Sequence, residues 1–354
     1  MRRLLGGWKA LPPLVEDAKP QGRGRSSRRI GQLTAGRNVS ESGPGSDHAA
    51  AREAFLAFVT MEGRAQNTRT RYAAELRTFV DFCESRRVMR LSKVTPLLVD
   101  AYRAERRQTC SASTVFMETA VIKQLMRWCH SRLLIAVNLL AAYRVPKVIS
   151  KKRPSPTLED VQAILSASRP RLRRILATLA FAGLRIGELR QLRPEDVDLS
   201  DGWIHVESRE GAETKTHRSR KIPIHPVLRE ILKEQPSTEP WFFRTAQSGD
   251  TPEESRPIAP RKINMQFQKV AAAMGLAVGL KENGYTIHSL RHFFETFTVN
   301  SRIPQPAVDS WMGHQGVRSM GKAYYELPDS DSQRFMRDVP FSLGTSACAA
   351  GNTA

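Results

Sequence analysis

The sequence predicts a mostly helical protein with two folded domains, the second of which also holds a small antiparallel β-sheet (an α+β fold). Three observations support this fold class. Apolar residues recur at helical spacing from about residue 49 onward. The stretches "WIHVES" and "RKIPIH" alternate in polarity as strands do. A basic segment bounded by prolines, residues 146–156, interrupts the helical pattern between the two domains.

The composition points to a polyanionic partner. The 354 residues include 55 Lys and Arg against 35 Asp and Glu, which gives a net charge of +20 and a pI near 10.4. Neutralisation of phosphates supplies most of the non-specific affinity for nucleic acid, so nucleic acid is the first candidate. An anionic membrane is the second, but no basic amphipathic helix stands alone. The longest apolar runs, such as 175–184, are about half the length that spans a bilayer, so no membrane partner is expected.

The first domain is predicted to be all helical and to cover residues 49–145, after a disordered basic segment at 1–48. That segment is rich in Gly, Ser, Pro and Arg, so it cannot bury enough surface to offset its ordering entropy. In the domain, Thr95 and Pro96 have the residue types of a helix N-cap and first position. One helical face carries Tyr72, Leu76, Phe79, Val80 and Cys83.

Arginines decorate the polar faces of these helices, among them Arg69 and Arg71. One such face is usually just solvated, whereas several on a chain of this charge suit contact with DNA phosphates. The connector at 146–156 adds Lys151, Lys152 and Arg153. We expect these five residues to contact DNA.

The second domain is predicted at 157–338, with a tail at 339–354. Thr157 and Asp160 form a helix-capping pattern. The next helix is apolar and ends at Gly183. The sequence then indicates strands at 203–208 and 220–225 joined by a turn, and helices at 226–235, 262–275, 286–300 and 304–313.

Four stretches of this domain could carry chemistry, and the first is "AGLRIGELRQL" (182–192). Gly183 breaks the buried helix, which places Arg185 at the start of the next element. An arginine between apolar neighbours is costly unless it meets an anion. The alternative is a salt bridge to Glu188, three residues on and on the same helical face.

The second and third stretches contribute a lysine and a His-x-x-Arg pair. Lys215 lies near the tip of the turn between the strands, where it is either a solvated charge or a donor to a bound phosphate. His288 and Arg291 in "TIHSLRHFFET" (286–296) are three residues apart and share a helical face. A planar guanidinium beside a titratable imidazole suits a phosphate ligand.

The fourth stretch is "GHQGVRSMGKAYYEL" (313–327). Gly313 ends a helix, so His314 projects from its C-terminal edge. Tyr324 and Tyr325 follow ten and eleven residues after His314. Most tyrosines pack or face water, but a phenol becomes a nucleophile where neighbouring groups remove its proton.

Taken in this order, an Arg box, a hairpin Lys, "HSLRH" and "MGHQGV…AYY" resemble the motifs of the tyrosine recombinase (phage integrase) family. The resemblance is specific over about 153–327. It is looser over 49–145, where position and periodicity are similar to the family's helical core-binding domain. Two departures are visible: "MGH" replaces the commoner Leu-Gly-His, and "YYEL" lacks the His often found two residues past the nucleophile. The resemblance implies a two-domain DNA clamp with a catalytic domain at 157–338.

The resemblance further implies a site-specific DNA recombinase or integrase. Such an enzyme cuts and rejoins strands through a covalent 3′-phosphotyrosyl intermediate, without metal, ATP or another cofactor. Arg185 and Arg291 would hold the non-bridging phosphate oxygens, and His288 and His314 would add hydrogen bonds. Lys215 would protonate the leaving 5′ oxygen.

Glu188 would orient the segment that carries Arg185 rather than react. The family's spacing after the histidine favours Tyr324 as the nucleophile, and Tyr325 is the alternative, rotated by about 100° if the segment is helical. Two other functions stay open: a protein of the same fold that binds DNA without cutting, and an enzyme like the type IB topoisomerases.

The expected partner is double-stranded DNA that carries a specific recombination site. The resemblance implies a homotetramer on paired sites that associates weakly off DNA, and a place in the cytoplasm at the nucleoid. The associated processes would be DNA recombination and integration of a mobile element. No structural metal is expected, since the cysteines form no C-x-x-C pair and no His lies at zinc-finger spacing.

Overall fold

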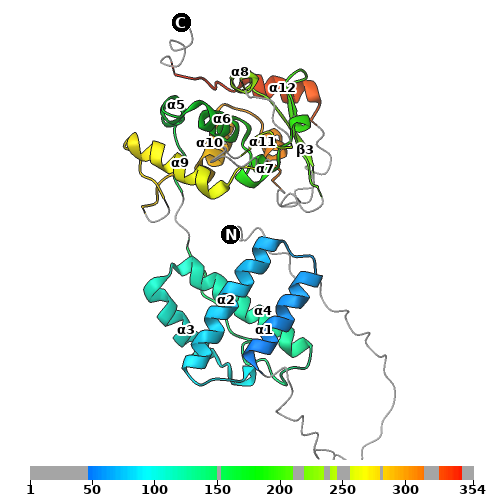
Figure 1. Cartoon of the computed structure of the whole chain (residues 1–354), viewed down its shortest axis with the longest axis vertical. Coiled ribbons are helices and arrows are strands. Elements are labelled where there is room, and N and C mark those ends of the chain that lie inside the picture. The colour runs from blue at the N-terminus through cyan, green and yellow to red at the C-terminus, as the bar shows by residue number, and fades with distance from the viewer. Residues whose placement is uncertain are drawn as a thin grey trace, which may run out of the picture. The chain divides into compact units, whose positions relative to one another are not determined.

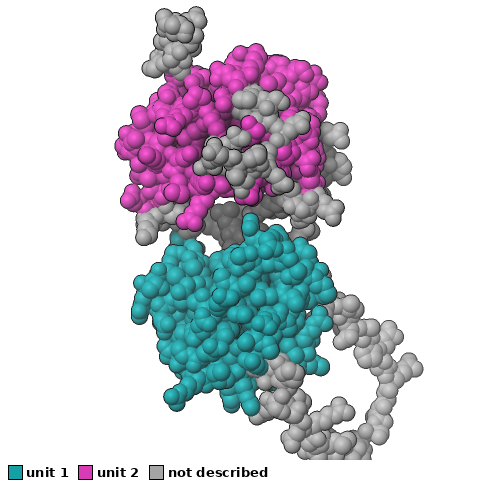
Figure 2. Space-filling model, viewed as in Figure 1, with its two compact units in different colours: residues 1–149 teal, residues 150–354 magenta. Residues whose placement is uncertain are grey.

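The structure is a computed structural model that describes residues 47–149, 153–209, 219–234, 240–244, 256–279, 282–314 and 327–344. The chain divides into two compact units, residues 1–149 and 150–354 (Figure 2). The predicted fold class is confirmed, because the described residues are mostly helical and include a small antiparallel sheet in the second unit. None of the described helices is both long enough and apolar enough to cross a membrane.

Unit 1 is a bundle of helices in which α4 packs against the three others. Thr95 caps α3 as predicted, because its hydroxyl accepts a hydrogen bond from the backbone N–H of Leu98 at 3.2 Å. Asp47 and Ser111 cap α1 and α4 in the same way. The described elements are α1 (His48–Met61), α2 (Gln66–Ser85), the 3₁₀ turn η1 (Leu91–Lys93), α3 (Pro96–Thr109) and α4 (Ala112–Ser131).

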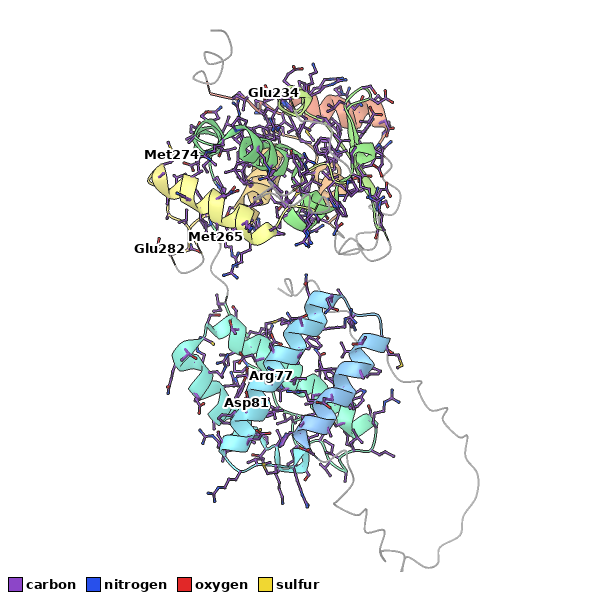
Figure 3. The ribbon with its side chains drawn as sticks, in the orientation of Figure 1. Arg77, Asp81, Glu234, Met265, Met274 and Glu282 are labelled. Atoms are coloured by element: carbon purple, nitrogen blue, oxygen red, sulfur yellow. The ribbon has the colours of Figure 1, made fainter. Side chains whose placement is uncertain are left out.

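The core of unit 1 follows the predicted helical face. All five residues predicted to face inward on α2 are buried, and Arg77 and Asp81 lie exposed on the same helix (Figure 3). Tyr102 of α3 packs edge-on against Phe79 and Phe82 of α2, with ring centroids 5.3 and 5.2 Å away. Aromatic pairs of this geometry favour a fixed arrangement of the two helices.

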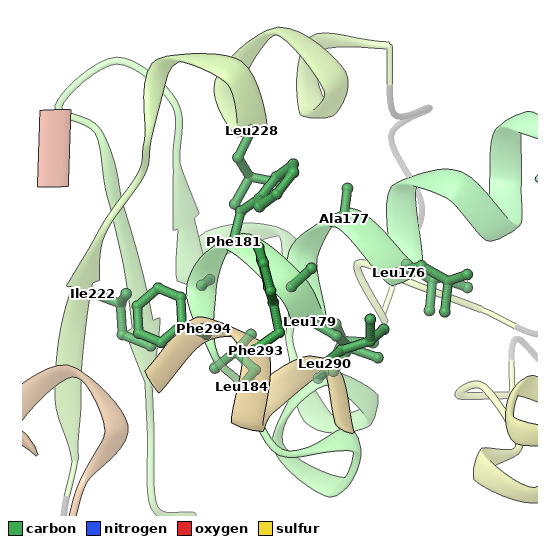
Figure 4. Packing of buried hydrophobic residues seen from close by; sticks show 14 of the residues in the cluster. Leu176, Ala177, Leu179, Phe181, Leu184, Ile222, Leu228, Leu290, Phe293 and Phe294 are labelled. Atoms are coloured by element: carbon green, nitrogen blue, oxygen red, sulfur yellow. The ribbon is translucent and has the colours of Figure 1, made fainter. Parts of the chain in front are cut away.

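Unit 2 surrounds one central helix, α6 (Figures 1 and 4). This helix packs against α5, α7, α8, α9 and α10. The neighbouring helix α5 begins with the predicted Thr157–Asp160 capping box, in which each side chain accepts from the other residue's backbone N–H. The described helices are α5 (Leu158–Ser166), α6 (Pro170–Ala182), α7 (Ile186–Gln191), α8 (Pro226–Lys233), α9 (Pro260–Ala273), α10 (Ile287–Asn300), α11 (Gln305–Met312) and α12 (Asp329–Asp338), with the 3₁₀ turn η2 (Pro194–Asp196).

The sheet of unit 2 has the order β1-β2-β3 with both pairs antiparallel. The predicted strands correspond to β2 (Trp203–Val206) and β3 (Arg220–Pro223), paired with Ile204 opposite Ile222. The two-residue β1 (Val197–Asp198) was not predicted. Both α11 and α12 pack against β3, so the sheet edge links the last two described helices.

The described C-terminal residues complete the core of unit 2. Phe341 is buried, and its ring lies 4.7 Å from that of Phe181 in α6 and 5.3 Å from that of Phe297 in α10. Nε2 of buried His225 is 3.0 Å from the carbonyl oxygen of Val339. The segment predicted as a tail therefore begins with core residues.

Candidate active site

The end of α6 places Arg185 through a glycine that no larger residue can replace. Gly183 adopts φ +64°, and a methyl group there would meet the ring of Phe294 at 2.4 Å. The left-handed backbone ends α6, and the close approach to α10 excludes a side chain. Leu184 is buried directly after it, and Arg185 becomes the N-cap residue of α7. The side chain of Arg185 is 23% exposed, so it can meet an anion at the surface.

Glu188 accepts hydrogen bonds from Arg185 and also from a second arginine. Its Oε2 accepts from the backbone N–H of Arg185 at 2.9 Å, and its Oε1 accepts from Nη1 of the same residue at 2.7 Å. Arg220 of β3 donates to both oxygens, at 3.1 and 2.8 Å. Burial alone would raise the pKa of Glu188, but the hydrogen bonds and charges of Arg220 and Arg185 outweigh it and lower the pKa. Glu188 is therefore ionised, and both of its carboxylate oxygens accept hydrogen bonds from arginines.

Arg291 joins three distant segments of unit 2. It is 3% exposed and lies on α10, where its Nη1 donates to the carbonyl oxygen of Gly183. Its Nη2 donates to the carbonyl oxygen of Met312 at 2.6 Å and contacts Nε2 of His314 at 3.2 Å. Burial, followed by the positive charge of Arg185, lowers the pKa of Arg291 to about 10, so it stays protonated at neutral pH. The guanidinium therefore connects the ends of α6 and α11.

His314 follows α11 and faces both charges of the site. Gly313 ends α11 at φ +62°, and the backbone N–H of His314 then bonds the carbonyl oxygen of Asp309 at 2.9 Å. Because an arginine can only donate, Nε2 of His314 accepts from Arg291 and Nδ1 carries the proton. Nδ1 lies 3.6 Å from a carboxylate oxygen of Glu295. Burial and the charge of Arg291 lower the pKa of His314 and favour the neutral ring.

His288 lies one turn before Arg291 on α10 and is exposed, whereas Arg291 is buried. Its ring centroid is 4.8 Å from that of His292. Loss of ring hydration, and then the charges of His292, Arg291 and Arg153, lower the pKa of His288 to about 4. The imidazole of His288 is therefore neutral at neutral pH, and one of its ring nitrogens can accept a hydrogen bond.

The stretch of sequence that carries these residues matches one protein family. Residues 156–330 match the sequence profile of the phage integrase family. This range contains Arg185, Glu188, Arg220, Arg291 and His314, the residues that the structure brings together. The chain belongs to the phage integrase family.

Curated relatives of this integrase-family chain include recombinases of bacteria and archaea. It is 24% identical over 280 residues to tyrosine recombinase XerC of Halalkalibacterium halodurans, covering 75% of this chain and 88% of the relative. It is 22% identical over 270 residues to tyrosine recombinase XerA of Pyrococcus furiosus, covering 75% of this chain and 85% of the relative. Both alignments extend well beyond the catalytic motifs.

Solved integrases share the fold at low sequence identity. A λ integrase fragment (residues 75–356), crystallised as a dimer bound to a core site, has a TM-score of 0.60 and 19% identity, and it covers 76% of this chain and 95% of its own. A λ integrase tetramer bound to a Holliday junction has a TM-score of 0.62 and 17% identity, with 82% of each chain covered. The arrangement of elements is therefore that of an integrase.

Some of the predicted integrase residues lie outside the described residues. These are Lys215, Tyr324, Tyr325, Lys151 and Lys152. Their roles stay predictions.

Two of the predicted DNA-contacting arginines lie on α2 of unit 1. Arg69 and Arg71 are both half-buried. Nε of Arg71 lies 3.6 Å from Oε1 of Glu75, and its guanidinium lies over the ring of Tyr72, with Cζ 5.3 Å from the centroid. Their contact with DNA stays a prediction.

Arg220 was not among the site residues that the sequence predicted. The missed signal was the strand alternation of "RKIPIH": Arg220 has the same parity as the buried Ile222 and Ile224, which predicts an inward arginine. An inward arginine needs a buried anion, and Glu188 is that anion. The predicted alternative for Arg185, a salt bridge to Glu188, is present and coexists with an exposed guanidinium edge.

Among the described residues, no group of three or more His, Cys, Asp or Glu side chains could hold a metal ion. The carboxylates nearest the cluster are instead committed to arginine and histidine, as Glu188 and Glu295 show. The site is a concentration of cationic and neutral nitrogen donors. Such a site suits an anionic substrate.

Proposed function

We propose that this protein is a site-specific DNA recombinase that cuts and rejoins strands through a 3′-phosphotyrosyl intermediate. The observation that carries this function is the position of Arg291. It bonds the carbonyl oxygen of Gly183, 108 residues away, and contacts His314, 23 residues away. Three segments that resemble the family's motifs are thereby joined in one cluster, which chance similarity of short motifs would not produce.

The proposed cleavage step is an in-line displacement at phosphorus. The phenol oxygen of Tyr324 forms a bond to the phosphorus, and the bond from phosphorus to the 5′ oxygen breaks. We assign the removal of the phenol proton to His288, whose ring is neutral at neutral pH, and the cationic arginines lower the cost of forming the phenolate. Lys215 gives a proton to the leaving 5′ oxygen. A 5′ hydroxyl from a second strand then reverses the same steps and releases the tyrosine.

Arg185 and Arg291 are proposed to stabilise the charge that grows on the non-bridging oxygens. Arg185 supplies the exposed edge of its guanidinium, since among the described residues only its Nη1 is bonded, to Glu188. A guanidinium has five N–H donors, and described residues occupy three of those on Arg291. His314 orients Arg291 through their 3.2 Å contact, while its Nδ1 lies 3.6 Å from a carboxylate oxygen of Glu295.

Unit 1 is proposed to act as the second half of a DNA clamp. We assign 49–145 to a core-binding domain, 146–156 to the linker, and 157–338 to the catalytic domain. Arg69 and Arg71 on α2, with the linker residues Lys151, Lys152 and Arg153, would contact phosphates. Among the solved relatives, λ integrase is bound to DNA as a dimer and, on a Holliday junction, as a tetramer. We propose a homotetramer on paired sites here, working at the nucleoid.

Covalent capture tests the function directly. The protein is incubated with a pool of nicked duplex oligonucleotides and denatured, and protein–DNA adducts are isolated and sequenced. We expect an adduct whose modified peptide carries DNA on Tyr324 and which the Tyr324→Phe variant does not form. An adduct on Tyr325 would keep the function and move the nucleophile.

Two outcomes contradict the proposal. Tight DNA binding with no adduct on any duplex would favour a non-cutting DNA-binding protein. Rapid relaxation of a plasmid without a recombination site, at low enzyme concentration, would favour an activity like that of the type IB topoisomerases. Tyr325→Phe is the matched control, since it removes an adjacent phenol from the same segment.

A further inference from the structure

Arg220 contacts both the segment that carries Arg185 and the segment that leads to His314. Its Nη1 and Nη2 donate to the two carboxylate oxygens of Glu188, at 3.1 and 2.8 Å. Its Nε donates to the carbonyl oxygen of Trp311 at 2.7 Å. The side chain is 8% exposed, so it is held inside the protein and does not face the surface as Arg185 does.

The contact with α11 is close as well as polar. A methyl group on Gly313 would lie 3.1 Å from Cδ and 3.2 Å from Nε of Arg220. The backbone that leads into His314 therefore rests on the Arg220 side chain. One guanidinium supports both Arg185, through Glu188, and His314, through Trp311 and Gly313.

Arg220 also changes the net charge of the group that it forms with Glu188 and Arg185. Glu188 alone would neutralise Arg185, because the two form a 2.7 Å ion pair. With Arg220 at 2.8 Å from the same carboxylate, two positive charges face one negative charge. The surplus of one positive charge is what an approaching phosphate meets, and in a poorly hydrated site such a charge acts strongly.

We propose that Arg220 is a positioning residue of the strand-cleavage reaction, which holds Glu188 so that Arg185 keeps both its orientation and its net positive field. This inference rests on the proposed function. Arg220 touches no substrate atom. Its effect reaches the reaction through Arg185 and through the backbone before His314.

The test uses charge on the scissile phosphate as its readout. The substrate is the nicked duplex selected by covalent capture, made once with the natural phosphodiester and once with a methylphosphonate at the scissile position. The methylphosphonate replaces one non-bridging oxygen by a methyl group and removes the negative charge. A residue that acts by stabilising that charge matters less on the neutral substrate, whereas a loss of folded protein lowers both rates equally.

We expect Arg220→Lys to form the adduct about 100-fold more slowly on the phosphodiester, since a small misplacement of a reacting group costs about that much. On the methylphosphonate the deficit should fall below about 10-fold. Lysine keeps the charge but cannot bridge both oxygens of Glu188 and the Trp311 carbonyl at once. Glu188→Gln is the second variant if Arg220→Lys does not fold, as judged by circular dichroism. It keeps both arginine charges and loses the ion pairs that orient Arg185, so its deficit should also be smaller on the methylphosphonate.

The matched control is Arg209→Lys. Arg209 donates from both terminal nitrogens to buried Asp196 in the same unit, so it loses an equivalent ion pair without contact to Arg185. Its deficit should be the same on the two substrates. If each of Arg220→Lys and Glu188→Gln is slowed equally on the two substrates, or is not slowed at all, this inference is overturned and the proposed function stands. Failure of the wild-type protein to form any adduct would overturn the proposed function and the inference with it.

Discussion

Among the described residues, each unit has one buried glutamate that accepts hydrogen bonds from arginine. The two clusters differ in their net charge. Glu118 in unit 1 is 3% exposed and accepts from Tyr102 at 2.8 Å and from Arg106 at 3.0 and 2.6 Å. Glu188 in unit 2 is 8% exposed and accepts from two arginines. Both carboxylates are saturated with donors, which is the condition for burying a charge.

The charge balance separates the two clusters. Glu118 faces one arginine and a neutral phenol, so the group has no net charge and ties α3 to α4. Burial and the hydrogen bond to Glu118 raise the pKa of Tyr102, which keeps the phenol neutral. Glu188 faces two arginines and leaves one positive charge over. The same chemistry serves packing in unit 1 and an anion site in unit 2.

The largest difference is expected when the exposed arginine is removed. Arg185→Gln should slow adduct formation about 10³-fold, because it deletes a donor aimed at the developing charge. Its counterpart in unit 1, Arg106→Lys, should leave the rate at saturating DNA unchanged and lower the stability of unit 1 instead. Single-turnover capture with both variants measures the two effects. A comparable loss of rate in Arg106→Lys would remove the distinction between the clusters.

The next effect is on the stability of unit 1. Glu118→Gln removes the buried negative charge and leaves Arg106 without its counterion, which should cost about 3 kcal/mol of unfolding free energy. Hydrogen exchange of amides in α3 and α4 reports this loss separately from unit 2. Amides of α6 serve as the internal control and should not change. Faster exchange in α6 would mean that the network is not confined to unit 1.

Acidic pH should lower the stability of unit 2 through His225, which is buried and neutral in the folded protein. Burial lowers the pKa of His225 to about 4 from an ordinary 6.5, and its Nε2 contacts the carbonyl oxygen of Val339. As pH falls from about 6.5 to 4, the unfolded chain binds a proton before the folded one, so folding is disfavoured. We expect a loss of about 2 kcal/mol by pH 4.5.

The pH effect is measured as hydrogen exchange of α6 amides, corrected for the intrinsic rate at each pH. His225→Gln cannot titrate, so its stability should change less over the same range. An identical pH dependence in the variant would assign the acid effect to the carboxylates. Ionised Glu188, whose pKa is lowered, is the first of these to consider.

The smallest effect concerns the neutral partner of Glu118. Tyr102→Phe keeps the ring packing against Phe79 and Phe82 and removes one hydrogen bond to a charged group. The expected cost is about 1.5 kcal/mol. Denaturant unfolding measures it, and the cleavage rate should not respond. A cost as large as that of Glu118→Gln would mean that the phenol, not Arg106, satisfies the carboxylate.

Local signals in the sequence were sufficient for most elements. Thr95 and Thr157 cap helices because their hydroxyls reach the backbone N–H groups three residues on, a relation contained within four residues. Gly183 and Gly313 end helices at positive φ for an equally local reason. These signals also placed Arg185 and His314 at element boundaries. They therefore located these two residues of the candidate site, whereas Lys215 and Tyr324 lie outside the described residues and stay predictions.

Relations between distant residues were not predictable from one sequence. Arg220 and Glu188 are 32 residues apart, and only the packing of β3 on α7 and α11 shows that they pair. The helix α12 was missed because its buried residues are few, with Met336 its one buried apolar side chain among those described. Trp311 donates from Nε1 to Ser332 at 2.8 Å and holds α12 in place, and this contact also depends on tertiary structure.

The aromatic cluster around Phe341 sets the order in which the protein can be made. Every residue of the unit 1 core precedes residue 144, so that unit can close while the rest of the chain is still being synthesised. The core of unit 2 includes Val339 and Phe341, which follow all of its described helices and strands, and Phe341 packs against Phe181 of α6 and Phe297 of α10. Unit 1 can therefore fold while the chain is still attached to the ribosome, before the arginine cluster of unit 2 can assemble. The growing chain would acquire its reactive centre last.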